Sequence, residues 1–468
     1  MAEPTGAAVD VYTQGEAVET YGLHTGVLGP VETLAQSISA IAPSTSPSLT
    51  IPLVFALAGN ATWFVYLLAT GAILLVGFCV SRFARLSASP GSLYSYAADT
   101  LPPLFGVAAA WGLLLAYVAT GASVAGGALY YTNLLSTQFL HWSPPSIVTL
   151  VVVCAVASFI AFRDVKLSAE LMLWVEVASV SLIVTVLAVM PLHFGLHLDM
   201  DQFRLRGASF SALGPALVLS MFSFVGFESA TTLGAEARNP LHTIPRAVLQ
   251  GAILAGVFFM LCSYSEVLGF RGASSKLSET TSPLHLLAER AGVAPLGIAI
   301  DFGALISMWA CVLACTTAAG RVLIRMAHGK LLPAVFGRTN RTHGTPGPAI
   351  ALSCGLMLVA TIAMSLKAFS GADMYDLLGS LSVFGFLTAY ALVALALPFA
   401  RRAAGQHSHL VMAVSIITVL VMVMIAVFDL RSTSDAMHAR IPYIYLGYIL
   451  AGLAWYGMRR KKAGITAD

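Results

Sequence analysis

The sequence predicts an all-α integral membrane protein with about twelve transmembrane helices. Of its 468 residues, 58% are hydrophobic and only 10% are charged, and the mean hydropathy is +0.83. A soluble domain carries about 25% charged residues, so this chain has too little charge to cover a water-facing surface. Apolar stretches of about 20 residues, the length that spans a bilayer, recur along the whole chain. Two of these stretches are interrupted by residues that break helices.

The apolar stretches place the expected spans. They cover residues 31–57 (broken), 61–81, 104–135, 145–162, 168–192, 211–237 (broken), 243–268, 295–320, 348–367, 373–399, 408–429 and 441–459. The six cysteines all fall inside apolar runs, and we expect them to be small buried side chains, with no disulfide framework. Residues 1–30 are polar and lack the basic start and short apolar run of a secretory signal, so they are expected to form a tail.

The basic residues of the loops predict the orientation. If the N-terminus is cytoplasmic, 17 of the 25 Lys and Arg residues lie on the cytoplasmic side. Cytoplasmic loops carry the excess of Lys and Arg. We therefore expect a multi-pass protein of the cytoplasmic (inner) membrane with tails 1–30 and 460–468 both in the cytoplasm. Arg321 and Arg325 are expected to set this topology or to contact phospholipid rather than substrate.

The two interrupted stretches predict a binding site. The first contains the run Ala42-Pro-Ser-Thr-Ser-Pro47, and the second contains Val225-Gly226. Because an unpaired backbone group in hydrocarbon costs several kcal/mol, a break survives only where it is buried in protein or lines a cavity. Paired breaks in two halves of a chain are typical of a transporter's substrate site. The candidate substrate-binding residues of the breaks are Ile41, Ala42, Ser44, Thr45, Ser46, Phe222, Val225 and Gly226.

Simpler interpretations of these residues stay open. The first break is alternatively a proline kink whose freed backbone groups are satisfied by a neighbouring helix. Phe222 is alternatively an ordinary core or lipid-facing side chain, since the chain has 24 Phe residues.

The spacing of the breaks predicts an internal repeat. They fall in the first and sixth expected spans, which suggests two inverted repeats of five spans, residues 31–192 and 211–399, followed by two appended helices within 408–459. An odd number of spans makes the halves insert with opposite orientations, and the two breaks then meet near the middle of the membrane.

Three motifs resemble one known family. The run Phe222-Ser-Phe-Val-Gly-Phe-Glu-Ser-Ala230 and the segment 235–247 resemble the sixth-helix signature of the amino acid–polyamine–organocation transporters. Residues 91–96, leading to Trp111 and Tyr117, are similar to the start of that family's third helix, and residues 320–333 and 344–349 look like the loop after its eighth.

The resemblance implies a leucine-transporter-like fold and secondary transport of an amino acid or an amine by alternating access, with symport as the expected mode. It also implies that Phe222 covers the substrate, and that Tyr117 and Trp309 line the pocket. Ordinary packing is the alternative for both of the latter aromatic residues.

The first break departs from the family pattern and leaves the substrate class open. Many members carry a Gly-Ser/Thr-Gly stretch there, where this chain has Ala42 to Pro47. Pro43 and Pro47 each remove a backbone donor, while the three hydroxyl residues between them still offer amides and hydroxyls. We expect a small neutral amino acid, and a cationic amine or polyamine is the alternative. A non-transporting sensor on the same fold is a further alternative.

Two acids in the middle of spans are candidate coupling residues. An ionisable side chain at the bilayer centre costs at least about 2.5–3.5 kcal/mol, so Glu228 and Glu176 are functional candidates. Glu228 matches a family acid beside the second break; it either carries a proton or is hydrogen-bonded to the broken backbone. Glu176 either faces the same cavity or ties two helices together. Ser179 aligns with the position where proton-coupled relatives often carry a Lys.

A sodium ion is the alternative coupling ion. Its ligands would be carbonyl groups of the first break with Thr316 and Thr317, because hard oxygen ligands suit such a cation. The alternative role of these two hydroxyls is to satisfy helix carbonyls. We expect proton coupling, no other cofactor, no nucleic acid and no obligate protein partner; the partners are the small substrate and membrane lipid. The spans show neither a nucleophile–base set nor a metal cluster, so we do not expect an enzyme.

Overall fold

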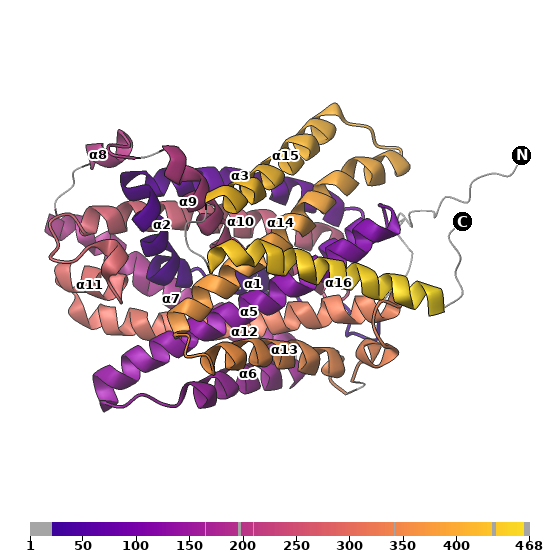
Figure 1. Cartoon of the computed structure of the whole chain (residues 1–468), viewed down its shortest axis with the longest axis horizontal. Coiled ribbons are helices and arrows are strands. Elements are labelled where there is room, and N and C mark those ends of the chain that lie inside the picture. The colour runs from indigo at the N-terminus through magenta and orange to yellow at the C-terminus, as the bar shows by residue number, and fades with distance from the viewer. Residues whose placement is uncertain are drawn as a thin grey trace, which may run out of the picture.

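The structure, a computed structural model, describes residues 21–163, 165–194, 198–208, 210–340, 342–432 and 437–462. Across these residues the regular structure is helical throughout, apart from one isolated bridge between Leu28 and Ala237 (Figure 1). The all-α prediction is therefore confirmed. The expected tails fall largely on residues 1–20 and 463–468, which lie outside the described residues.

Each expected span corresponds to a helix or to a broken pair of helices. The first half holds α1 (Pro30–Ile41), the π-helical η1 (Ser46–Thr50), α2 (Ile51–Ala58), α3 (Thr62–Ala84), α5 (Pro103–Leu140), α6 (Ser146–Arg163) and α7 (Val165–Phe194). The second half holds α9 (Phe210–Phe222), η3 (Ser229–Leu233), α10 (Pro240–Gly269), α12 (Ala294–His328), α13 (Gly347–Ser365), α14 (Gly371–Ala403), α15 (His409–Ser432) and α16 (Ile441–Lys462).

Length and composition alone identify nine candidate membrane spans among the described residues. The first of them, Pro30–Ala84, contains two expected spans, and Ser211–Phe222 is shorter because the sixth span is broken. The helix α16 is long enough but carries four tyrosines, Tyr443, Tyr445, Tyr448 and Tyr456, which lower its hydropathy.

Three helices form the centre of the bundle. The most extensive helix–helix contact in the described fold joins α5 to α14, and α12 also packs against α5. Small residues allow this approach: a side chain on Gly126 of α5 would lie 2.9 Å from the Gly371 carbonyl oxygen of α14. Close packing at small residues is what holds membrane helices together, since lipid provides no hydrophobic driving force between them.

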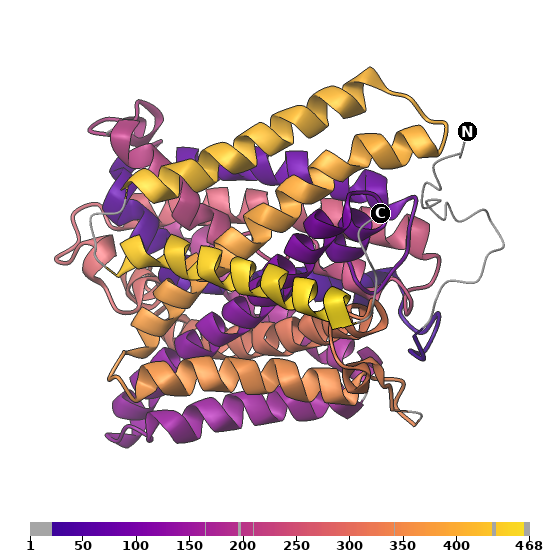
Figure 2. The ribbon, with the colours of Figure 1, turned by 45° about the vertical axis from the view of Figure 1, so that its right-hand side comes forward.

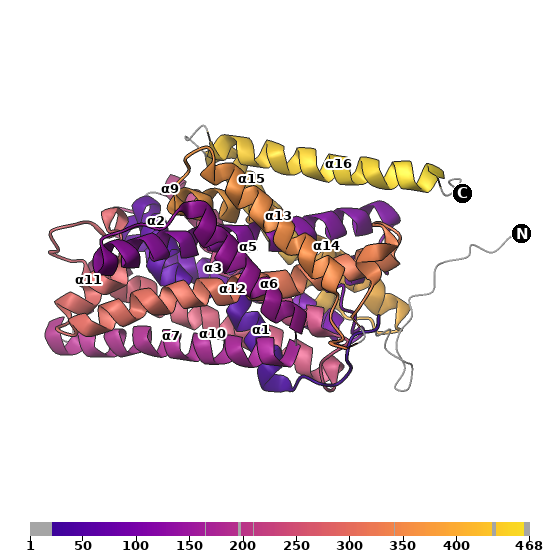
Figure 3. The same ribbon diagram turned by 90° about the horizontal axis from the view of Figure 1, so that it is seen from below.

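The remaining helices surround this centre. The helices α6 and α13 lie side by side at one edge of the bundle (Figure 2), and α16 and α7 run along opposite edges (Figure 3). Two short helices, α8 (Met200–Phe203) and α11 (Pro283–Arg290), lie at the end of the bundle opposite to the C-terminal end of α16 (Figure 1).

Local sequence explains both breaks. The helix α1 ends at Ile41. The next residue, Ala42, adopts the left-handed conformation at φ 49°, and Pro43 follows with no N–H to continue the helix. The helix α9 ends at Phe222 in a series of tight turns, and Gly226 then takes φ 93°, which a residue with a side chain rarely adopts. The chain is therefore irregular at the two predicted places.

Candidate functional site

The two breaks contact each other directly. A β-carbon on Gly226 would lie 2.8 Å from the Cβ and the carbonyl oxygen of Ala40, in the last turn of α1. The Ser229 hydroxyl donates to the Gln36 carbonyl at 3.0 Å, and the Ala230 N–H donates to the Ser37 hydroxyl at 3.3 Å. Two segments nearly 200 residues apart in sequence are therefore joined at the centre of the bundle, as paired breaks predict.

The second break satisfies most of its own polar groups. Backbone N–H groups of Val225, Phe227 and Ser229 each donate to the carbonyl three residues earlier, at 2.9–3.2 Å. The hydroxyls of Thr231 and Thr232 donate to the carbonyls of Glu228 and Ser229 at 2.7 Å. Val225 is buried within these turns. Few groups of this segment are left for a ligand.

The first break leaves hydroxyls without partners. The hydroxyl oxygens of Ser39, Ser44 and Thr45 are buried, and no described protein group hydrogen-bonds to them. Leaving a buried donor or acceptor unsatisfied costs about 1–3 kcal/mol, so such groups require an explanation. The neighbouring predicted residues Ile41, Ala42 and Ser46 are buried beside them. This segment therefore presents polar groups that a bound ligand would satisfy.

Two tyrosines hold Glu228. The Tyr117 hydroxyl of α5 donates to one carboxylate oxygen at 2.8 Å, and the Tyr390 hydroxyl of α14 donates to the other at 2.6 Å. All three side chains are fully buried. The arrangement places Tyr117 beside the second break, where the resemblance had assigned it to the pocket. Tyr390 was missed because nothing in its local sequence sets it apart from other apolar-run tyrosines.

Phe222 lies between the second break and α14. Its ring packs edge-to-face on Tyr375 at 5.3 Å, and a β-carbon on Gly379 would lie 2.7 Å from that ring. The Tyr375 hydroxyl is in turn 2.7 Å from the Thr50 hydroxyl of η1. Phe222 therefore lies close to the helix that follows the first break. Whether it covers a substrate stays a prediction.

Glu176 and Ser179 connect α7 to α12. The Ser307 hydroxyl lies 2.9 Å from both carboxylate oxygens of Glu176, and the Ser179 hydroxyl donates to the Gly303 carbonyl at 2.8 Å. Ser179 thus links two helices at the position where relatives carry a Lys.

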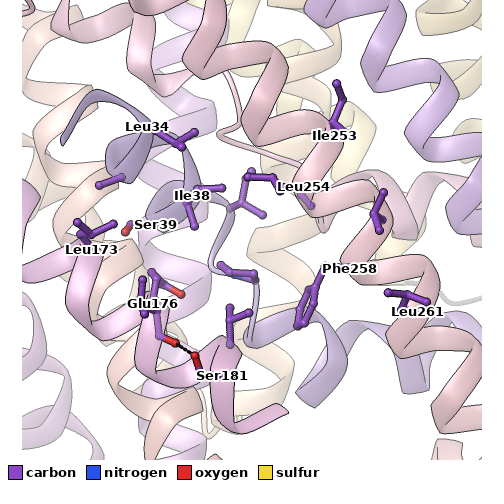
Figure 4. A pocket seen from close by; sticks show the side chains of 17 residues that line it. Leu34, Ile38, Ser39, Leu173, Glu176, Ser181, Ile253, Leu254, Phe258 and Leu261 are labelled. Atoms are coloured by element: carbon purple, nitrogen blue, oxygen red, sulfur yellow. Dashed lines mark hydrogen bonds between the residues drawn. The ribbon is translucent and has the colours of Figure 1, made fainter. Parts of the chain in front are cut away.

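A cavity of about 580 Å³ lies between α1, α7 and α10, and Glu176 lies on its wall (Figure 4). The cavity is open to the outside of the bundle, since its lining residues Val177, Leu254 and Leu261 are exposed. The lining is almost entirely apolar; α1 contributes Leu34, Ile38 and Ser39, and α10 contributes Leu254 and Phe258. The cavity reaches Pro43 in the first break. It therefore brings Glu176 and the unpartnered Ser39 hydroxyl to one space.

The predicted sodium ligands point in different directions. The Thr316 hydroxyl contacts the Met357 sulfur of α13 at 3.7 Å, on the far side from the first break. The Thr317 hydroxyl is buried without a described partner. Cys311 is the α12 residue that reaches the break, since its thiol donates to the Ala40 carbonyl at 3.2 Å. A shared role for Thr316 and Thr317 stays a prediction that this geometry does not favour.

Trp309 is half-buried on a different face of α12. It follows the exposed residues Phe302 and Ile306 at helical spacing, so it shares their side of the helix. Among the described residues, no hydrogen bond or ring contact joins Trp309 to either break.

A buried ion pair fastens the second break to α12. Arg321 donates two hydrogen bonds of 2.6 Å to the carboxylate of Glu236, and a third of 3.0 Å to the Thr317 carbonyl. Both side chains are buried. Arg321 therefore lies in a buried ion pair and not against lipid, and its expected part in setting the topology stays a prediction. Sequence reasoning missed this pair because its two members lie 85 residues apart.

Comparisons with known proteins agree with this architecture. The sequence profile of the family described as amino acid permease matches residues 37–457. The branched-chain amino acid permease BcaP of Lactococcus lactis is 25% identical over 370 residues, covering 75% of this chain and 76% of that protein. The low-affinity putrescine importer PlaP of Escherichia coli is 27% identical over 312 residues, 63% of this chain and 66% of that protein.

A solved structure shows the same fold. The crystal structure of MhsT in complex with L-phenylalanine superposes with a TM-score of 0.58 at 15% identity, over 88% of this chain and all of that one. The expected leucine-transporter-like architecture with broken first and sixth helices is thereby confirmed.

Proposed function

The chain belongs to the amino acid permease family, whose members are transporters rather than enzymes, and on that premise we propose that it moves a small neutral amino acid across the cytoplasmic membrane by alternating access. One observation carries the proposal: the hydroxyls of Ser39, in the last turn of α1, and of Ser44 and Thr45, in the first break, are buried without a described partner. They flank Ala40, the residue that Gly226 of the second break contacts. The direct test is uptake of labelled amino acids and amines into proteoliposomes. An absence of transport across the whole panel contradicts the proposal.

The substrate class follows from the polarity of the two breaks. A zwitterion would place its carboxylate against the hydroxyls and amides of the first break, at the start of the following helix, where partial positive charge favours an anion. Glu228 already accepts two tyrosine hydroxyls, so it is less available to a substrate ammonium group. A small neutral amino acid fits these groups better than a long cation does.

A cationic amine is the second candidate, and one observation favours it. Glu176 lies on the wall of the cavity that reaches Pro43, so its carboxylate is placed to attract an ammonium group. A relative named as a putrescine importer is compatible with this alternative. Competition binding with an amino acid and its decarboxylated amine separates the candidates. Equal binding of the amine contradicts carboxylate recognition by the first break.

We propose a proton as the coupling ion, with Glu228 as the residue that carries it. A proton on Glu228 would remove the negative charge beside the second break and weaken the two tyrosine hydrogen bonds, which are strongest to an ionised acceptor. Sodium bound near Thr317 is the alternative. Uptake driven by a pH gradient or a sodium gradient, in wild type and in Glu228→Gln, tests the choice. Sodium dependence with unaltered uptake in Glu228→Gln contradicts it.

The orientation belongs to the same proposal. With both termini in the cytoplasm, α8 and α11 face the outside, and the Arg321–Glu236 pair lies on the cytoplasmic side of the breaks. The repeat boundaries 31–192 and 211–399 are likewise proposed. Labelling of single cysteines introduced beside α11 and after α16, from each side of intact cells, tests the topology.

A further inference from the structure

Glu266 is a third acid inside a membrane helix, and its surroundings differ from those of the others. It lies in the last turn of α10 and is 0% exposed. Neither of its carboxyl oxygens has a hydrogen-bond partner among the described residues. The other buried glutamates are satisfied: Glu176 by Ser307, Glu228 by two tyrosines, and Glu236 by Arg321.

Because Glu266 has no described partner, its surroundings favour one protonation state of the carboxyl group over the other. A buried carboxylate with neither a cation nor a donor pays a desolvation penalty of several kcal/mol that nothing offsets. The desolvation penalty of a neutral carboxylic acid is much smaller, because polar groups without a net charge are then removed from water. The packed state shown by the structure therefore accommodates Glu266 with its proton on.

Among the described residues, the electrostatic interactions of Glu266 are with tyrosines and a thiol. Its electrostatic neighbours are Tyr66 of α3, Tyr131 of α5 and Cys262 one turn earlier on α10. On α11, His285 binds Asp301 at 2.6 Å, and Arg290 donates to the backbone carbonyls of Gly269 and Arg271 beyond the end of α10. Two tyrosines and a thiol are thus the groups that interact with this carboxyl, while the Arg290 guanidinium donates to carbonyls at the end of α10.

A hydrogen bond connects this neighbourhood to the second break. The Tyr66 hydroxyl lies 3.0 Å from the hydroxyl of Ser223, the first residue after α9. Glu266 lies at the C-terminal end of α10, which ends at Gly269 and is followed by the segment that leads to α11. One hydrogen bond therefore joins Tyr66 to the second break, and Glu266 lies where α10 ends.

We propose that Glu266 is a second proton-binding site, distinct from Glu228, that exchanges its proton during the transport cycle. In the closed packing the carboxylic acid is intact. When water enters at the end of α10, the O–H bond breaks, the proton passes to water, and a hydrated carboxylate remains; reclosure requires the reverse step. Proton binding would explain why an acid that destabilises a membrane helix is present at this position. The inference rests on the proposed function and adds a proton to it.

Infrared difference spectroscopy on the full chain in lipid tests the protonation without any substrate. The expected result is a carbonyl stretch of a protonated carboxylic acid that is present at neutral pH in wild type, lost in Glu266→Gln, and retained in Glu228→Gln. Tyr66→Phe is expected to shift this band by changing the surroundings of Glu266, which keeps the test valid if Glu266→Gln fails to fold. A spectrum that neither Glu266→Gln nor Tyr66→Phe alters contradicts the proposal.

Transport tests the coupling. A pH gradient of one unit drives about tenfold accumulation for each coupled proton, so Glu266→Gln is expected to lose about that factor in gradient-driven accumulation while exchange of substrate persists. Glu279→Gln, an exposed glutamate paired with Lys276, is the matched control and is expected to behave as wild type. Unchanged accumulation in Glu266→Gln contradicts the proposal. If wild type transports nothing, the proposed function fails, and the infrared result still decides the protonation of Glu266.

Discussion

The two breaks differ in how they treat their polar groups. The first break, at Ala42 to Thr45, leaves three nearby hydroxyls buried and unpartnered. The second break, from Ser223 to Leu233, bonds its backbone and hydroxyls internally and to α1. The difference indicates that the first break is the segment that meets a ligand, and that the second is a fixed support against which the first is held.

The two breaks also differ in how firmly they are held to the rest of the bundle. The second break is fastened by the buried pair of Glu236 and Arg321. The helix α2, which continues the first break, ends beside Asn60, which Arg271 joins to Asp199 in a partly exposed network. A buried pair holds its geometry strongly, whereas an exposed one is screened by water and salt. Movement is therefore expected at the first break before the second.

The largest expected effect comes from breaking the anchor of the second break. Arg321→Met leaves the Glu236 carboxylate buried without a cation, and the loss of one partner of a buried pair costs about 3–5 kcal/mol. Thermal unfolding in detergent is expected to show a strongly lowered midpoint and weak expression. The double variant Arg321→Met with Glu236→Gln is expected to recover much of that stability. Equal stability of Arg321→Met and wild type contradicts an anchoring role.

The next effect tests the contact between the breaks. Gly226→Ala places a β-carbon 2.8 Å from Ala40 at a backbone angle of φ 93°, and strain of this kind costs about 1–3 kcal/mol. We expect a lowered unfolding midpoint and uptake close to background. Gly355→Ala is the control, because a β-carbon at Gly355 in α13 meets nothing within 4 Å. If both variants transport alike, the breaks do not need their close approach.

A smaller effect is expected in the first break, and it separates binding from stability. Ser44→Ala and Thr45→Val each remove a hydroxyl that has no described partner, so the free energy of unfolding should stay the same or rise. Substrate affinity should fall about fivefold for each, since a hydrogen bond contributes about 1 kcal/mol. Binding and thermal unfolding measured on the same samples check this. A loss of stability without a loss of affinity would assign these hydroxyls a structural role.

The smallest effect concerns the exposed anchor at the end of α2. Burial raises the pKa of the Asp199 carboxyl, but hydrogen bonds from Arg271 and Gln202 outweigh it and hold the pKa below its usual value. Because the folded pKa is lowered, the stabilisation is present above the unfolded value of about 3.9 and is lost as pH falls through the folded pKa.

The unfolding midpoint of wild type is therefore expected to fall at acid pH slightly more steeply than that of Asp199→Asn. Added salt should reduce the difference at neutral pH, because the Arg271 side chain is partly exposed. Identical pH profiles for the two proteins contradict a contribution from this pair.

Local patterns in the chain are enough to predict the spans and the places where they break. Apolar runs of spanning length are a local signal, and so are Pro43, Pro47 and Gly226, because proline removes a donor and glycine permits an angle that other residues avoid. The helix bounds agree with the expected spans to within a few residues at most ends, except that α5 and α12 extend further. The acids Glu176 and Glu228 were also found, since a charge in an apolar run is visible without a fold.

Which side chains contact one another depends on the tertiary structure. Tyr390 donates to Glu228 from 162 residues away, Cys311 rather than a threonine reaches the Ala40 carbonyl, and Thr316 turns towards α13. Glu266 became conspicuous only when the fold showed that it has no partner. Hydrogen bonds between helices depend on their rotation and distance, which packing around small residues fixes across the whole bundle. The local sequence patterns did not predict how each helix is rotated against its neighbours.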